Sequence, residues 1–211
     1  MGFSAHNDRM PQDVEQAFLT EMMMSGAEKT DAQIWQGIAA TNGQFGGFIE
    51  LFTAEATVVK ANNGIVPTGV AITSANVISE FDKVKQAIPV SLRRKNLAWI
   101  VSPDVADAYD SALISAGVTN GLGGNANTSQ VYGRYTVETV NGLPDNTIVV
   151  YEIKNLFFGT GLLSDHNEVR IKDMDESDLS GTVSYKEVFT AGVQVANPED
   201  VVLYLSTTTP A

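Results

Sequence analysis

Apolar side chains recur at helical spacing between Pro11 and Gly37, and acidic or amide side chains occupy most of the positions between them. The apolar stripe consists of Val14, Phe18, Leu19, Met22 and Met23. This pattern predicts one long helix, or two helices broken at Gly26, because glycine inside a helix costs about 1 kcal/mol relative to alanine. An unbroken helix would be about 39 Å long at about 1.5 Å per residue. Its apolar face therefore has to be covered by a large neighbouring element.

A helix, a strand and a second helix are predicted in the middle of the chain. Thr73-Ser74 is expected to cap the first helix, and Pro89 to end it. The apolar run Leu97–Val101 predicts a buried strand, after which Ser102-Pro103-Asp104 starts the next helix and Gly117 ends it. The inner faces of the two helices carry Val77, Phe81, Val84, Ile88, Val105, Tyr109, Ala112, Leu113 and Ala116. This order of elements indicates an α/β layer.

Strand-forming segments dominate the chain after Tyr135. Glu168 to Val195 is predicted to form a long β-hairpin, and Leu156-Phe157-Phe158-Gly159 to close a layer. Val201–Leu205 is predicted to be a final buried strand, whereas Ile49 to Lys60 fits either a short helix or a strand. We expect an α+β chain with two lobes, in which the long helix packs against the hairpin because neither can bury its apolar face alone.

The segment from Gly117 to Gly133 contains five glycines and several amide residues, which predicts a mobile surface loop. Its Gly121-Leu122-Gly123-Gly124 motif has neither the glycine spacing of a dinucleotide-binding turn nor the lysine of a phosphate-binding loop. We therefore expect no nucleotide site in this loop.

Charge and composition narrow the classes of function. The 211 residues contain 25 acidic and 13 basic side chains, for a net charge of -12, and no cysteine. Such a charge argues against a sequence-specific nucleic-acid-binding protein, and the basic Arg93-Arg94-Lys95 cluster fits a solvated turn. The missing cysteines exclude disulfides and thiolate metal sites. We see no secretory signal and no apolar run of about 18 residues, so no membrane association is predicted.

Residues of the types that catalyse reactions or bind metals are present, but in unsuitable arrangements. Ser164, Asp165 and His166 are neighbours in a predicted turn and lack the nucleophile elbow of a hydrolase, and the other histidine is His6. The acidic run from Asp173 to Asp178 lacks the glycine and the terminal glutamate of a calcium-binding loop, and fits a hairpin tip. We therefore predict no catalytic residues, no metal site and no cofactor.

The order of several motifs resembles a known shell protein. A long helix ends at Trp35-Gln36-Gly37, and a loop ending Phe45-Gly46-Gly47 follows. The later motifs, in order, are the strand-Ser-Pro-helix unit from Trp99 to Leu113, Gly142-Leu143-Pro144, Phe157-Phe158-Gly159-Thr160, the long hairpin and Asn197-Pro198-Glu199-Asp200-Val201-Val202-Leu203. Over most of residues 11–206 this resembles the major capsid protein of tailed bacteriophages, whose fold is shared with encapsulin shells.

The resemblance implies a division into two domains. Residues 11–65 and 164–197 would form a peripheral domain, with Pro11 to Gly37 as its spine helix and Glu168 to Val195 as its β-arm. Residues 66–163 and 198–211 would form the axial domain around the capsomer centre. Residues 1–10 are expected to be a disordered start or a remnant of cloning. Family members usually have an N-terminal arm and an extended loop before the spine helix, so we expect this chain alone to be a monomer or weak oligomer.

The implied function is that of a structural subunit, without enzymatic activity, of an icosahedral phage or prophage capsid enclosing double-stranded DNA. Copies would assemble into hexamers and pentamers in the bacterial cytoplasm, with scaffolding or portal proteins as further partners, and the virion would be the final location. Candidate contacts between subunits are Trp35, Gly121, Gly123, Gly124, Lys186 and Glu187. A small acidic hydrolase-like enzyme and an extracellular β-rich binding module remain as alternatives.

Overall fold

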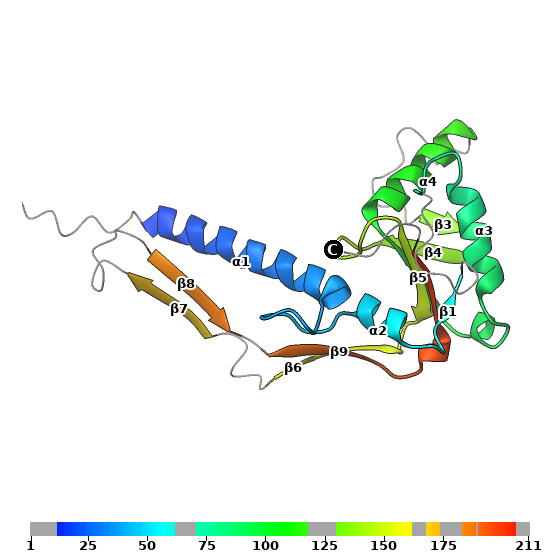
Figure 1. The fold of residues 1–211 in the computed structure, drawn as a ribbon. Helices are drawn as coiled ribbons and strands as arrows, with labels where there is room; N and C mark the ends of the chain where they lie inside the picture. The colour runs from blue at the N-terminus through cyan, green and yellow to red at the C-terminus, as the bar shows by residue number, and fades with distance from the viewer. Residues whose placement is uncertain are drawn as a thin grey trace, which may run out of the picture.

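The computed structural model describes residues 12–61, 71–117, 130–161, 168–173, 183–188 and 190–205, with the backbone alone for 12–19, 168–173 and 183–188. A compact lobe carries a long helix, α1 (Gln12–Gln36), that extends away from it (Figure 1). The predicted long helix is confirmed, and it is unbroken at Gly26. At about 1.5 Å per residue its 25 residues span about 37 Å.

A six-stranded mixed sheet forms the middle of the lobe. Its strand order is β1 (Val59–Lys60), β10 (Val201–Leu205), β5 (Thr147–Glu152), β2 (Leu97–Val101), β4 (Tyr135–Thr139) and β3 (Gln130–Tyr132). The pairs β1–β10 and β2–β4 are parallel, and the other three are antiparallel. The predicted buried strands Leu97–Val101 and Val201–Leu205 lie inside the sheet, where both of their faces are covered. Their continuous apolar sequence is typical of such strands.

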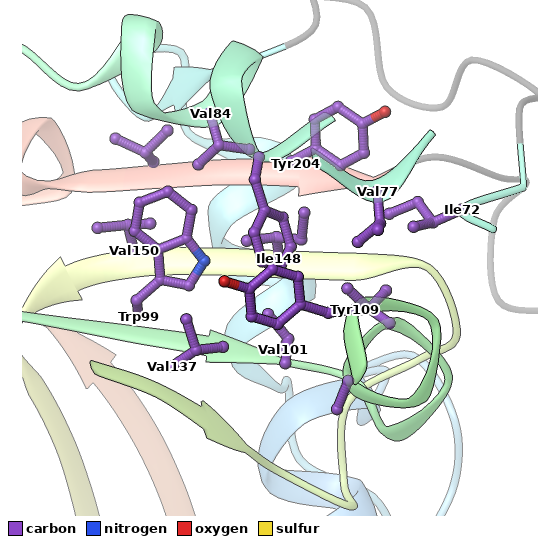
Figure 2. Close-up of a cluster of buried hydrophobic side chains, with 14 of the residues drawn as sticks. Ile72, Val77, Val84, Trp99, Val101, Tyr109, Val137, Ile148, Val150 and Tyr204 are labelled. Atoms are coloured by element: carbon purple, nitrogen blue, oxygen red, sulfur yellow. The ribbon is translucent and has the colours of Figure 1, made fainter. Parts of the chain in front are cut away.

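Successive side chains on the central strands enter two different cores, because neighbours along a strand point to opposite faces. On β5, Ile148 and Val150 face one core and Val149 faces the other. Helices α3 (Val77–Ala87) and α4 (Pro103–Ser115) cover the first face, where Trp99 and Tyr109 lie among valine and isoleucine side chains (Figure 2). Helix α2 (Phe48–Ala54) and the end of α1 cover the second.

The helix boundaries agree with the sequence pattern with one correction. Ser102 and Pro103 begin α4 as predicted, and Gly117 follows its end with φ +69°, a conformation that glycine adopts without strain. Helix α3 begins later than predicted, because Thr73 lies in a turn and Asn76 is the N-cap. The Asn76 side chain accepts a hydrogen bond from the Thr73 backbone at 2.7 Å, which stabilises that turn. Residue 116, predicted to face inward, is exposed.

A two-stranded ribbon leaves the lobe below α1 (Figure 1). Near the lobe, β6 (Leu156–Thr160) pairs with β9 (Ala191–Val195), and further out β7 (Glu168–Asp173) pairs with β8 (Val183–Val188). Seven residues separate β6 from β7, but two separate β8 from β9, so five extra residues offset the two ladders. The predicted long hairpin is therefore divided into two ladders that are out of register with each other.

The predicted role of residues 156–159 in closing a layer was wrong. They form β6, in which Phe157 and Phe158 are 54% and 45% exposed. Neighbouring side chains on a strand point to opposite faces, so both faces of this ribbon are open to solvent at these positions, which a run of apolar residues does not reveal. The ambiguous segment from Ile49 to Lys60 divides into α2 and β1.

The packing of α1 on the outer ribbon stays a prediction. The side chains of 12–19, β7 and β8, which would form that contact, are outside the described residues. The predicted mobile loop falls mostly on residues 118–129, which also lie outside them. Two short 3₁₀ segments, η1 (Leu92–Arg94) and η2 (Pro198–Asp200), complete the described elements.

Tyrosines that are partly or fully buried should make the fold sensitive to alkali. The Tyr132 hydroxyl donates a hydrogen bond to Asp82 Oδ1 at 2.6 Å. Burial raises the pKa of Tyr132 well above its ordinary value, and the bond to Asp82 raises this pKa further. Burial also raises the pKa values of Tyr109 and Tyr151. The folded chain therefore holds protons that the unfolded chain releases above about pH 10, so this stabilisation is complete below that pH and is lost as pH rises through the folded-state values.

We predict that the free energy of unfolding falls steadily above about pH 10. The Tyr132→Phe variant should be less stable at neutral pH by about 1 kcal/mol, because a hydrogen bond is lost, but should show a smaller alkaline decrease. Urea denaturation at a series of pH values measures both quantities. Equal alkaline slopes in the wild type and the variant would contradict the prediction.

Candidate functional site

The end of α1 is the point at which the long helix joins the lobe. Trp35 is 7% exposed, and its ring centroid lies 5.2 Å from that of Phe48 on α2. The same core includes Leu143, from the turn after β4, and Val149, from the central strand β5. The last turn of α1 is thus held by an aromatic anchor in the second core. We call the contacts of this last turn with residues 45–48 and 140–143 the helix junction.

Two glycines let the chain return against the end of the helix. The Gly47 backbone N–H donates to the Gly37 carbonyl at 2.7 Å. A Cβ atom on Gly37 would lie 2.2 Å from the Phe45 carbonyl oxygen, and one on Gly47 would lie 2.7 Å from the Trp35 carbonyl oxygen. These separations are too short for any side chain. The Trp-Gln-Gly and Phe-Gly-Gly motifs therefore meet each other in space.

A third glycine brings the turn after β4 against α1. The Gln36 amide Nε2 donates to the Gly142 carbonyl at 2.9 Å. A Cβ atom on Gly142 would lie 2.5 Å from the Asp31 carbonyl oxygen and 2.7 Å from the Trp35 ring. The helix therefore touches the turn backbone to backbone. Sequence reasoning found each of these glycine motifs but did not predict their contact.

An asparagine pair holds the base of the ribbon to the lobe. The buried Asn155 side chain donates to the Asn197 carbonyl at 2.8 Å and accepts from the Asn197 backbone N–H at 2.7 Å. The Asn155 carbonyl also accepts from Ala196 at 3.0 Å. Both chain segments that enter the ribbon are thereby fixed to each other. The sequence showed only turn-forming residues at these positions.

Two sets of charged groups in the lobe are paired, one around Glu80 and one around Lys95. Glu80, 5% exposed, accepts hydrogen bonds from Tyr204 and from Lys83, whose Nζ lies 2.8 Å away. Lys95 bridges Asp200 and Glu152, and its hydrogen bond to Asp200, followed by the one to Glu152, raises the pKa of the lysine. These groups join α3 to β10 and η1 to η2. Each therefore has a structural role.

The structure brings no catalytic or metal-binding group together in the described ranges. No cluster of three or more metal-ligating side chains occurs there. His6, the Ser164-Asp165-His166 turn and most of the acidic run after Asp173 lie outside the described residues. Among the described helices, none combines the length and the hydropathy needed to cross a lipid bilayer.

The candidate contacts between subunits have different positions. Trp35 lies in the second core, and the contacts that the structure shows for it are within the chain. Gly121, Gly123 and Gly124 fall outside the described residues. Lys186 and Glu187 lie on β8, of which only the backbone is described. The roles of all six between subunits stay predictions. The sequence pattern assigned Met23, Phe157 and Phe158 to packed faces, but the structure exposes them, together with Met24, on α1 and β6.

A glycine-to-alanine substitution at the helix junction should destabilise the fold, whereas the same substitution on the ribbon should not. Gly142→Ala forces a methyl group against the backbone of α1, and we expect it to lower the free energy of unfolding by about 2 kcal/mol. Gly192→Ala is the control, because its Cβ atom would meet nothing within 4 Å, and alanine suits a strand better than glycine. Guanidinium denaturation followed by tryptophan fluorescence compares the two. Equal stability of both variants would contradict the assigned role of Gly142.

The comparisons with known proteins give similarity in structure alone. The sequence matches no protein-family model and no curated protein. In structure, it is similar to a chain of the satellite phage P4 procapsid that includes the size determination protein, with a TM-score of 0.60 and 12% identity over 93% of this chain and 69% of that one. The capsid of an empty GTA particle gives a TM-score of 0.55 and 13% identity over 91% and 66%.

An encapsulin complex from Synechococcus elongatus is also similar, with a TM-score of 0.52 and 13% identity over 98% of this chain and 72% of that one. The chain therefore spans about two thirds of the length of the shell proteins that it matches. The predicted α+β capsid-like fold is confirmed, and the chain has the fold of phage capsid and encapsulin shell proteins.

Proposed function

We propose that this chain is a structural subunit of an icosahedral phage or prophage capsid. The observation that carries the proposal is the helix junction, which joins a long helix to a compact lobe within a capsid-like fold. A shell subunit has to present extended elements to its neighbours at fixed angles. Backbone contacts at Gly37, Gly47 and Gly142 supply such a fixed angle.

In the proposed shell, the lobe built on the six-stranded sheet is the axial domain, and α1 with the ribbon is the peripheral domain. The proposed residue divisions, 11–65 with 164–197 and 66–163 with 198–211, follow these parts except at β1, which belongs to the sheet of the lobe, and β6, which belongs to the ribbon. Copies would meet in hexamers and pentamers, with residues 118–129 near the capsomer centre. Scaffolding and portal proteins would be further partners.

The charge of the chain fits a container for double-stranded DNA. A net charge of -12 disfavours tight binding of a phosphate backbone over the surface as a whole. Packaged DNA could then be held by confinement inside the shell. The subunit itself would need no reaction chemistry, and it would reach the virion after assembly in the host cytoplasm.

Expression of the complete open reading frame that contains this sequence, in a bacterial host, tests the proposal. We expect closed particles of uniform diameter by negative-stain electron microscopy, because many modest contacts repeated by symmetry stabilise a shell. The 211-residue chain is the matched comparison, and we expect it to be a monomer or weak oligomer by light scattering. A complete protein that forms no particles at any concentration would contradict the shell function, and a tight dimer that turns over a substrate would favour an enzyme instead.

A further inference from the structure

Four basic residues lie near the end of α3, the helix that packs on the face of the sheet opposite to α1 (Figure 1). We call Lys85, Arg93, Arg94 and Arg134 the basic surface. Arg134 donates to the Arg93 carbonyl at 2.8 Å, and Arg93 donates to the Lys85 carbonyl at 3.4 Å, so the backbones that carry them are adjacent. All four side chains are exposed.

Contacts within the chain hold three of these cations in place without neutralising them. Lys85 Nζ lies 5.4 Å from the centre of the Tyr132 ring, and the Arg134 guanidinium lies 5.0 Å from that of Tyr135. Arg93 donates to the Ile88 carbonyl at 3.0 Å, as a cation at the end of a helix does. Among the described residues, none of the four forms an ion pair within 4.0 Å.

This lack of neutralisation is unexpected for the composition. The chain has 25 acidic side chains against 13 basic ones, and neighbouring Lys83 and Lys95 both have carboxylate partners. Four like charges at one place repel each other, and an anionic group brought to them would relieve that repulsion.

The complementary surface lies on α1. Glu21, Met24, Glu28 and Asp31 are spaced three or four residues apart and therefore share one face of the helix. We call them the acidic stripe. Its three carboxylates also form no ion pair within the described part of the chain, and Met24 at its centre is 55% exposed. The end of α1, the helix that carries the stripe, packs in the second core, and α3, which carries Lys85, packs in the first, so the two surfaces belong to helices on opposite sides of the sheet.

We propose that the basic surface of one copy binds the acidic stripe of a second copy. The two surfaces differ, so the contact is head-to-tail, and head-to-tail contacts generate rings when the rotation between copies closes. This inference rests on the proposed shell function, because it supplies a contact between neighbours in a capsomer. Duplex DNA is the competing occupant of a basic surface, but the net charge of -12 around it disfavours a polyanion of that length.

Site-directed cross-linking of the otherwise cysteine-free chain tests this contact. Ser91→Cys places a thiol at the N-cap of η1, next to Arg94, since positions i and i+3 are neighbours in a 3₁₀ helix. Met24→Cys places the second thiol in the acidic stripe, and neither substitution removes a charged side chain. Met23→Cys is the matched control, because Met23 is also exposed, at 63%, but points about 100° away around the helix.

Purified Ser91→Cys chains are mixed with Met24→Cys or Met23→Cys chains at low salt and treated with a short bismaleimide. We expect about fivefold more heterodimer with Met24→Cys, and loss of this excess at about 1 M salt, where charges are screened within about 3 Å. Adding Arg94→Glu to the Ser91→Cys chain should remove the excess, and Glu28→Lys in its partner should restore it.

Equal cross-linking of the two methionine positions, or an excess that Arg94→Glu leaves unchanged, would overturn the proposal. Binding of a fluorescent DNA duplex that Arg94→Glu abolishes, without the cross-linking excess, would assign the surface to nucleic acid instead. Because the cross-link forms between unassembled chains, it is independent of particle formation. Particles without the excess would reject this contact alone, and the excess without particles would reject the shell function alone.

Discussion

The backbone contact between the last turn of α1 and two turns of the lobe is the constraint on which the shape of this molecule depends. A helix of 25 residues has contacts with the lobe only near one end, so a small change of angle there moves its far end by many ångströms. Gly37, Gly47 and Gly142 remove the side chains that would separate the backbones, and Trp35 fills the core beside them. The direction of α1 is thus set by close packing, which has little freedom to yield.

The six-stranded sheet connects the helix junction to the rest of the lobe. Strand β5 pairs with β10 on one side and β2 on the other, and its alternating side chains contribute to both cores. The helix junction and the α3–α4 layer therefore rest on opposite faces of the same strands. On the other side of the junction, the hydrogen bonds between Asn155 and Asn197 fix the base of the ribbon. The two extended elements, α1 and the ribbon, consequently start from one rigid base.

The sequence predicted the helices and strands better than the tertiary contacts between them. Periodicity located α1, the inner face of α3 and strands β2 and β10, because helix and strand faces repeat locally. It could not show that Gly142 meets Asp31, since that contact joins residues far apart in sequence and depends on the absence of side chains. Two predictions were wrong for local reasons. Thr73 has the chemistry of a helix cap but lies in a turn closed by Asn76. Phe157 is apolar but is exposed on the ribbon. The basic surface could not be predicted from the sequence, because Arg93 and Arg94 on their own fit a solvated turn. Only the fold brings Arg134 and Lys85 beside them.

The central claim is that the direction of α1 is fixed by contacts within the single chain. Electron–electron distance measurement between spin labels tests this most directly, since the chain has no cysteine that would need to be removed. Labels at Ala27→Cys on α1 and Ser111→Cys on α4 report the angle between the helix and the lobe, and both positions are exposed. A single narrow distance distribution in the dilute, unassembled chain is the result that the close-packed junction predicts. A broad or multi-peaked distribution would contradict it, because the junction would then leave the direction of the helix free.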